Sequence, residues 1–445
     1  MPGGTWTSQN KVRPGVYIRF TSTQGLGLTV GERGTVAICE PMSWGPVGTV
    51  QTVESGADTT PYCGYDITSP EAMFLQQIFL GTNRTDGANT VLLYRPTASS
   101  SAQATVTTGV LTATALYPGV RGNDITIVIT EEVDGDTFTV STVVDGNVVD
   151  EQTNITNVSD LVANSWVTWS GEGAVAATAG SPLTGGNDGT VESAAYSTFL
   201  TAIEPYKFDI LIYDGTDPTV QTAMTSFIQR MNDDNGQYCQ LVGANFTNPD
   251  SRYVINVMSP ATLNDGTELT MQQVCWWVGG AEAGAMYNES LTNATYPNAV
   301  STTMMTNSQY IAALNGGQFV LTADNGRVYV EQDINSLVTY TTDITEVYRY
   351  NRTMRLANTI ANDLYQQFSQ NYIGIVNNNE QGRSMFQAAI VGYLLGIQNN
   401  QGIQNFEASD VEVLPGEAIN AIVVNLNIQP VGSVEKIYIT ISMDA

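Results

Sequence analysis

The sequence predicts a multidomain protein of mixed α/β and α+β class with an inserted β-sandwich. Residues 186–340 alternate helical patterns with unbroken apolar strands, which is typical of a parallel sheet covered by helices. Residues 97–185 are dense in Thr, Val and Ser and show short strands without a convincing helix, which favours a β-sandwich or barrel. Residues 341–430 carry two long helical patterns followed by strands, as expected of an α+β domain.

The first 96 residues divide into an arm and a small α+β segment. Residues 1–20 end in a short apolar strand over positions 16–20, which follows the breaker Arg13-Pro14-Gly15. In residues 21–96, "TVAICE" and "TVLLYRP" predict strands. The stretch "SPEAMFLQQIFLG" between them predicts a helix, because Ser and Pro suit a helix start and Gly suits its end.

Short patterns predict the remaining elements. In the β region, Asp145-Gly146-Asn147 predicts a hairpin turn between two strands, and the glycine-rich "SPLTGGNDG" predicts a linker into the next region. The α/β region holds strand patterns such as "FDILIYD" and "YCQLVGA" and helical patterns such as "PTVQTAMTSFIQRMND". Two long helices are expected at about 346–371 and 380–398.

The chain also ends on a strand pattern, in residues 431–445, "VGSVEKIYITISMDA". Ile437, Ile439 and Ile441 alternate with Tyr438 and other residues that suit strands. An exposed apolar strand edge promotes aggregation, so strands at both chain ends need partners. They either pair with each other or add to the sheets of neighbouring copies, and the second arrangement extends into rings or helical arrays.

The charge of the chain excludes several classes of partner. It has 43 acidic and 16 basic residues and a net charge of −27. Nucleic-acid binding needs a basic face, and anionic membrane surfaces repel an acidic protein, so we expect neither as a partner. No apolar run approaches the roughly 20 residues of a membrane span. The first ten residues, "MPGGTWTSQN", lack a signal-peptide pattern, and we expect the protein to stay in a reducing cytoplasm.

The residue types for common catalytic and cofactor sites are missing. There is no histidine, which removes His-based acid–base catalysis and the commonest transition-metal ligand. The four cysteines are far apart, and "GLGLTVG" lacks dinucleotide-loop spacing. Asp209 and Asp214 flank an apolar strand as at an α/β active-site rim, but no nucleophile accompanies them. We therefore expect no enzyme and assign no catalytic, cofactor or metal residue.

Arg349, Arg352 and Arg355 form a cluster of basic residues. On a helix their spacing places them within an arc of roughly 120°. Two interpretations remain open: a docking face for an acidic partner, or ion pairs with Glu346 and similar residues.

Eight stretches in order resemble one family. They are "RPGVYIRF", "LYPGVRGNDITIVI", "LTGGNDG", "PYKFDILIYDGTD", "WWVGGAEAGAMYNESLTNATYPNA", "GRVYVEQDINSLVTYT", "YIGIVNNNEQGR" and "PVGSVEKIYITISM". The chain resembles the sheath proteins of myophage-type contractile tails, which also occur in phage-tail-like bacteriocins. The resemblance covers nearly its whole length.

The resemblance implies the following fold. Residues 97–185 would form the β-sandwich, and residues 186–340 a domain likened to subtilisin without its catalytic residues. Residues 341–430 would form a C-terminal α+β domain, with residues 21–96 packed beside it. The arms 1–20 and 431–445 would insert as strands into the sheets of adjacent subunits.

The resemblance also implies a function and its residues. Six subunits would form a ring, and rings would stack around a tail tube and contract to drive it through a cell envelope. The partners would be other copies, the tube, the baseplate and the tail terminator, in a virion tail or tail-like particle assembled in the host cytoplasm. A capsid or surface-array subunit is the alternative. The expected arm residues are Val16, Tyr17, Ile18, Phe20, Val434, Ile437, Tyr438, Ile439 and Ile441; the hinges are Gly15, Pro430 and Gly432; the tube-facing residues are Arg349, Arg352 and Arg355.

Overall fold

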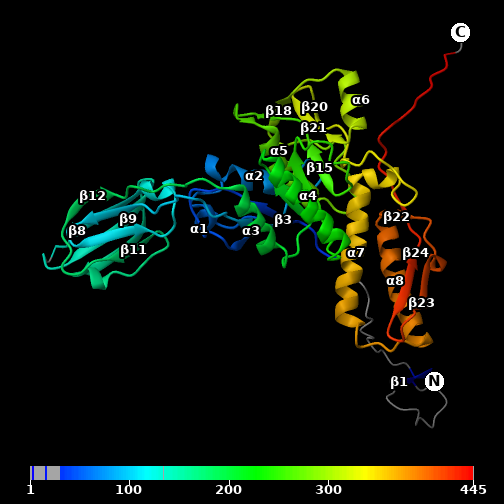
Figure 1. Cartoon of the computed structure of the whole chain (residues 1–445), viewed down its shortest axis with the longest axis horizontal. Helices are drawn as coiled ribbons and strands as arrows, with labels where there is room; N and C mark the ends of the chain where they lie inside the picture. Colours follow the sequence, from blue (N-terminus) through cyan, green and yellow to red (C-terminus); the bar gives the residue numbers. More distant parts are fainter. Residues whose placement is uncertain (1–2, 5–15, 18–30, 134, 444–445) are drawn as a thin grey trace. The chain divides into compact units, whose positions relative to one another are not determined.

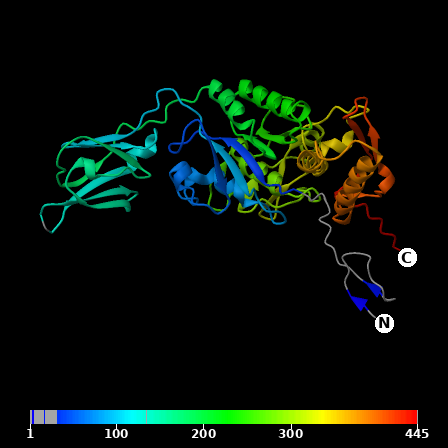
Figure 2. The ribbon, with the colours of Figure 1, turned by 90° about the horizontal axis from the view of Figure 1, so that it is seen from below.

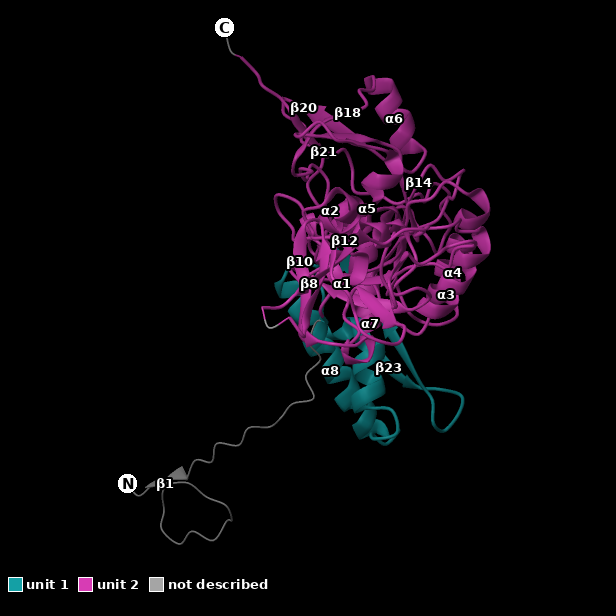
Figure 3. Ribbon diagram, turned by 90° about the vertical axis from the view of Figure 1, so that its left-hand side faces the viewer, with its two compact units in different colours: residues 1–31, 363–430 teal, residues 32–362, 431–445 magenta. Residues whose placement is uncertain are grey.

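A computed structural model describes residues 3–4, 16–17, 31–133 and 135–443. The chain groups into two compact units (Figure 3). Unit 1 comprises residues 1–31 and 363–430, and unit 2 comprises residues 32–362 and 431–445.

A seven-stranded sheet with the order β19-β15-β14-β13-β3-β5-β4 forms the centre of unit 2 (Figure 1). Its strands are β3 (Thr35–Cys39), β4 (Val50–Glu54), β5 (Thr90–Tyr94), β13 (Ile210–Tyr213), β14 (Gln240–Ala244), β15 (Val254–Val257) and β19 (Gln318–Phe319). All neighbours run parallel except β4, which pairs antiparallel with β5. The predicted parallel sheet is thus confirmed, and burial on both faces explains its unbroken apolar strands.

Residues 32–96 belong to unit 2, where β3, β4 and β5 form part of the central sheet. That this segment packs beside the C-terminal domain stays a prediction. Strand β3 pairs with β13, with Val36 opposite Ile210 and Ile38 opposite Ile212. The physical reason is that "TVAIC" and "TVLLY" are apolar on both sides, so both faces of these strands need cover.

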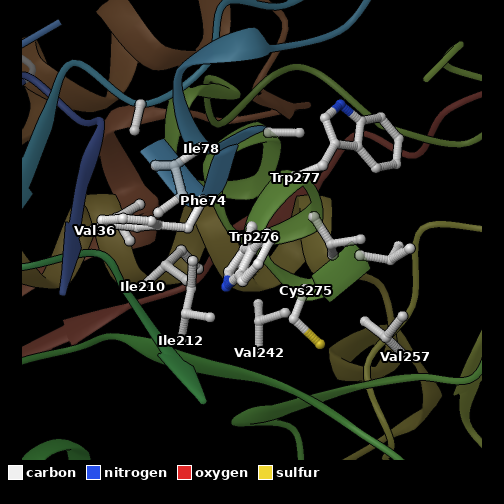
Figure 4. Close-up of a cluster of buried hydrophobic side chains, with 14 of the residues drawn as sticks. Val36, Phe74, Ile78, Ile210, Ile212, Val242, Val257, Cys275, Trp276 and Trp277 are labelled. Atoms are coloured by element: carbon white, nitrogen blue, oxygen red, sulfur yellow. The ribbon is translucent and has the colours of Figure 1, made fainter. Parts of the chain in front are cut away.

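Helices cover both faces of the central sheet. On one face, α2 (Met73–Leu80) and α5 (Met271–Gly284) pack on Val36, Ile210 and Val242 (Figure 4). On the other, α3 (Ser193–Ile203) and α4 (Pro218–Asp233) pack on alternate strand residues. Helices α2 and α5 touch closely, because a Cβ added at Gly280 would lie 1.9 Å from the carbonyl oxygen of Ile78.

Smaller elements complete this part of unit 2. Helix α1 (Thr60–Cys63) precedes α2. A three-stranded sheet is made of β16 (Ala261–Leu263), β17 (Glu268–Leu269) and β18 (Ala299–Thr302). It is followed by helix α6 (Asn307–Asn315) and by the hairpin of β20 (Leu321–Asp324) and β21 (Arg327–Val330).

The predicted β-sandwich is confirmed. One sheet has the order β11-β7-β6 and the other β10-β9-β8-β12. The strands are β6 (Thr105–Thr108), β7 (Leu111–Ala115), β8 (Ile125–Glu131), β9 (Phe138–Val144), β10 (Asn147–Ile155), β11 (Val167–Ser170) and β12 (Thr178–Pro182). The predicted hairpin turn has positive φ at Asp145 (52°) and Gly146 (78°), as a type I′ turn requires.

Two linkers and a buried tryptophan join the sandwich to the central sheet domain. The linker before β6 and the linker after β12 run side by side (Figure 2), since isolated β-bridges pair Ser99 with Thr190 and Ala102 with Asn187. Trp44, from the loop after β3, packs in the sandwich core with ring centroids 4.8 Å from Trp166. We infer that the sandwich is fixed to the domain that carries it.

We expect Trp44→Ala to lower the free energy of unfolding by about 3–5 kcal/mol, because it leaves a cavity where a fully buried indole stood. Chemical denaturation followed by circular dichroism measures the loss. The control is Trp169→Ala, since Trp169 lies only partly buried at the margin of the same core and should cost less. Equal losses for both variants would contradict the role given to Trp44.

Unit 1 is built on helices and short strands. Helix α7 (Asn351–Asn371) starts in unit 2 and ends in unit 1, and α8 (Glu380–Asn399) packs its Phe386 against Phe368. Two hairpin-like pairs follow, β22 (Ile403–Gln404) with β25 (Gln429–Pro430), and β23 (Val411–Pro415) with β24 (Ile422–Leu426). Both predicted long helices are present. The first begins late, because Tyr350 is extended (ψ 125°) after a 3-10 turn at Glu346–Arg349.

Candidate assembly surfaces

The C-terminal arm, residues 431–443, leaves its apolar side chains in solvent. No residue of this arm lies in a strand within the described part of the chain, and Figure 1 shows an extended segment that leads to the C-terminus. The exposed fractions are 83% for Val434, 76% for Ile437, 90% for Tyr438, 77% for Ile439 and 76% for Ile441. The arm thus presents a strand sequence without a sheet in its own chain.

The N-terminal arm is described only in part. Strand β2 (Val16–Tyr17) pairs in parallel with β1 (Gly3–Gly4). Ile18, Phe20 and the expected hinge Gly15 lie outside the described residues. The role of this arm between subunits stays a prediction.

Glu435 anchors the start of the C-terminal arm, and we call this anchored residue the arm root. Its carboxylate accepts hydrogen bonds from the Thr292 hydroxyl at 2.9 Å and from the Gln332 amide at 2.7 Å. Before it, Pro430 is held in β25, whereas a Cβ added at Gly432 would meet no atom within 4 Å. The chain is therefore held at Pro430 and again at Glu435, with open space around Gly432 between them.

The three clustered arginines do not share one surface. Arg355 is fully buried and pairs with Glu282 and, at 2.8 Å, with Asp333. The prediction that Arg355 faces the tube is therefore wrong, because its side chain is fully buried beside Asp333, a buried carboxylate that needs a cation. Arg349 donates to the carbonyl oxygen of Leu314, and Arg352 is half-buried. For Arg349 and Arg352, the tube-facing role stays a prediction.

Arg355, Glu282 and Asp333 form a buried ionic triad. Burial and the neighbouring Asp333 raise the pKa of Glu282 well above its usual range. Burial alone would raise the pKa of Asp333 too, but Arg355 and the Glu282 hydrogen bond outweigh it, and this pKa is lowered. The two carboxyl groups thus shift in opposite directions, and Glu282 takes up a proton more readily than Asp333.

The triad is connected to the root of the arm. Thr292 bridges the two, since the Asp333 N–H donates to its hydroxyl oxygen at 2.9 Å and that hydroxyl donates to Glu435. The Leu291 N–H also donates to the Asp333 carboxylate at 2.9 Å. The buried charges therefore fix the segment on which the arm is anchored.

Asp209 and Asp214 do not form one site. Asp209 precedes β13 and pairs with Arg33 at 3.2 Å. Asp214 follows β13 and lies near Glu40, which follows β3, while the Trp276 indole donates to Asp214 at 2.8 Å. Burial, together with Asp214, raises the pKa of Glu40, and burial also raises the pKa of Asp214.

The Glu40–Asp214 carboxyl pair is accompanied by few of the groups that a catalytic site requires. It lies where the strand order reverses between β3 and β13, a place where α/β sheets often bind ligands. The chain has no histidine, and the four cysteines are buried free thiols. Among the residues that the structure describes, no group of three His, Cys, Asp or Glu side chains could hold a metal ion.

We expect the Glu40–Asp214 pair to make stability fall as pH rises. Both carboxyl groups have raised pKa values in the folded chain, so the folded state binds more protons than the unfolded state. The free energy of unfolding should therefore decline above the ordinary carboxyl pKa of about 4. Glu40→Gln should make this decline shallower in urea unfolding measured between about pH 4 and pH 8.

The control for this pH experiment is Glu204→Gln. Glu204 is partly exposed, and hydrogen bonds from Arg230 lower its pKa in the folded chain to about 2, so above about pH 6 it is ionised in both the folded and the unfolded chain. Between about pH 6 and pH 8 the slope of stability with pH should therefore match that of the wild type. An unchanged slope in Glu40→Gln would show that the pair does not hold its proton.

Family profiles and solved structures match most of the chain. Profiles of phage tail sheath proteins match the β-sandwich domain (97–188), the central domain (189–336) and the C-terminal domain (343–444). A profile for the N-terminal region of domain III of the tail sheath protein Gp18 matches residues 33–95. The crystal structure of a sheath tail protein from Desulfitobacterium hafniense is 39% identical, with a TM-score of 0.86, covering 96% of this chain and 99% of that one. The chain belongs to the phage tail sheath protein family.

A second sheath structure supports this membership, and a protein of a phage-like element is similar over its whole length. The crystal structure of a sheath tail protein from Listeria innocua is 31% identical, with a TM-score of 0.77, covering 93% of this chain and 95% of that one. The phage-like element PBSX protein XkdK of Bacillus subtilis is 32% identical, and the alignment covers 100% of both chains. A tail sheath protein is a structural component of a tail and not an enzyme. Among the described residues of this chain, no helix is long and apolar enough to cross a membrane.

Proposed function

We propose that this sheath protein forms hexameric rings that stack helically around a tail tube and contract to drive the tube through a target cell envelope. The C-terminal arm is the observation that carries this proposal. Its strand sequence is exposed and has no sheet partner in the described chain. A strand donated to the next copy is a head-to-tail contact, which extends into rings and helices instead of closing as a dimer.

The C-terminal unit offers an acceptor for such a strand. The β23–β24 hairpin is two-stranded, so each strand keeps one edge unpaired among the described residues. Leu414, Ile422 and Val423 of this hairpin are exposed apolar residues. Next to it lies a groove of about 390 Å³, lined by Phe368, Phe386 and others. We propose that the arm of a neighbouring copy extends this hairpin.

The proposed contraction requires two kinds of contact. Strand linkages persist while the subunit bodies rotate, and the chain around Pro430 and Gly432 turns as the hinge, with Gly15 as its counterpart. The extended array is metastable, and new contacts between bodies release free energy on contraction. The likeness of the central domain to subtilisin belongs to this proposal, and its parallel sheet with helices on both faces supports it.

The proposed partners are further copies of the chain, the tube, the baseplate and the tail terminator. Arg349 and Arg352 are the candidates for the tube-facing surface. The proposed location is a virion tail or tail-like particle, which is assembled in the host cytoplasm.

Negative-stain electron microscopy of the concentrated protein, with and without the tube protein of the same particle, tests the proposal. We expect hollow striated cylinders, and we expect the tube to become coated. Flat arrays or closed shells would indicate another self-assembling structural protein. Failure to coat the tube would overturn the proposal.

A further inference from the structure

The longest uncharged stretch of the chain is residues 290–323. It contains no Asp, Glu, Lys or Arg, although 13% of all residues are charged and the net charge is −27. This stretch includes β18 and α6. An uncharged stretch is expected in a buried core. It indicates a contact surface only where its side chains are exposed.

Part of the stretch is exposed apolar surface. Met304 is 75% exposed, Ile311 is 51% exposed and Val300 is 41% exposed. In helix α6 only Ala313 is buried. Figures 1 and 3 both show α6 at the edge of unit 2 beside β18 and β20. We call Val300, Met304, Ile311 and the exposed side of α6 the neutral face.

Helix α6 is held in place although it covers almost no core. Short isolated helices are unstable in water, so other contacts must fix it. At its start, the Thr306 N–H donates to the Gln309 side chain at 2.7 Å in a capping box. At its end, Arg349 donates to the carbonyl oxygen of Leu314, and from its middle the Tyr310 hydroxyl donates to the carbonyl oxygen of Leu321 at 3.4 Å. These contacts keep the exposed side of α6 presented to solvent.

We propose that the neutral face is a contact surface for a second copy of this chain, within the proposed sheath assembly on which this inference rests. Two copies with a net charge of −27 repel each other wherever carboxylates meet. A surface without charge removes that repulsion and adds apolar burial. A basic partner would bind more favourably to the acidic surface elsewhere on the chain than to this uncharged face. Asp324 and Arg327, at the turn of the β20–β21 hairpin that packs beside β18, supply exposed charges as a rim next to an apolar centre.

Photocrosslinking identifies what covers the neutral face. The four native cysteines are buried, so Met304→Cys adds an accessible thiol for a benzophenone maleimide. Ser226→Cys, on the exposed side of α4, is the matched control. In the concentrated protein with tube, we expect the label at position 304 to link two sheath chains, and the control to give at most a small fraction of that product. Linkage to the tube protein, or no linkage, would overturn the proposal.

A charge placed on the face gives an independent test. Ile311→Glu should raise the concentration needed for assembly roughly tenfold or more, because each contact then brings a carboxylate against an acidic copy. Ser226→Glu, with the same charge on α4, should leave that concentration unchanged. Equal behaviour of both variants would overturn the proposal. Links at position 304 without cylinders would reject the sheath architecture alone, whereas cylinders without such links would reject the neutral face alone.

Discussion

Ile439→Asp is expected to abolish assembly while leaving the fold of the chain intact. Ile439 is 77% exposed, so the separate subunit loses no packing. In the proposed interface the new carboxylate would be buried without a partner, which costs several kcal/mol at every subunit contact. Sedimentation and electron microscopy measure assembly, and thermal unfolding confirms the fold.

Thr440→Asp is the matched control for the arm. It adds the same charge one residue later, on the opposite side of the strand. If one side of the donated strand packs on the acceptor, this variant should assemble better than Ile439→Asp. Normal assembly of Ile439→Asp would show that the C-terminal arm does not donate a strand.

Arg355→Met should destabilise the chain by about 3–5 kcal/mol, because it leaves the buried Asp333 carboxylate without its cation. Without Arg355, burial should raise the pKa of Asp333, so the loss should grow as pH rises above the ordinary carboxyl range of about 4. Urea unfolding at two pH values measures both effects. The variant should also assemble poorly, because the triad supports Thr292 and the arm root.

Two controls separate the triad from ordinary ion pairs. Arg230→Met breaks an exposed pair with Glu204 and should cost less than about 1 kcal/mol. Glu282→Gln keeps a hydrogen-bonding group and leaves Arg355 paired with Asp333, so its effect should be small compared with Arg355→Met. A stable Arg355→Met variant would contradict the role assigned to the triad.

The parts of the fold set by local chemistry could be predicted from the sequence. The turn at Asp145-Gly146 and the long helix over residues 380–399 depend on neighbouring residues, and both are present. The role of Arg355 could not be predicted, because its partners Glu282 and Asp333 lie 73 and 22 residues away. The position of β3 beside β13 is non-local in the same way.

The anchoring of the C-terminal arm could not be predicted from the sequence. The alternating apolar pattern predicts a strand in the arm, the described chain forms no strand there and leaves Ile437 and Ile441 exposed, and pairing with a neighbouring copy stays a prediction. The role of Glu435 as the arm root was missed, since its donors come from Thr292 and Gln332. The only local indication was an acidic residue, followed by Lys436, at the start of an otherwise apolar and uncharged strand pattern.

Backbone amide hydrogen exchange over residues 436–442, in dispersed and in assembled protein, tests the central claim most directly. The account predicts rapid exchange in the dispersed chain, where this segment has no strand partner. In the assembled protein it predicts strong protection, because the amides of the arm then pair with a neighbouring sheet. Assembled cylinders in which these amides exchange as fast as in the dispersed chain would contradict the account.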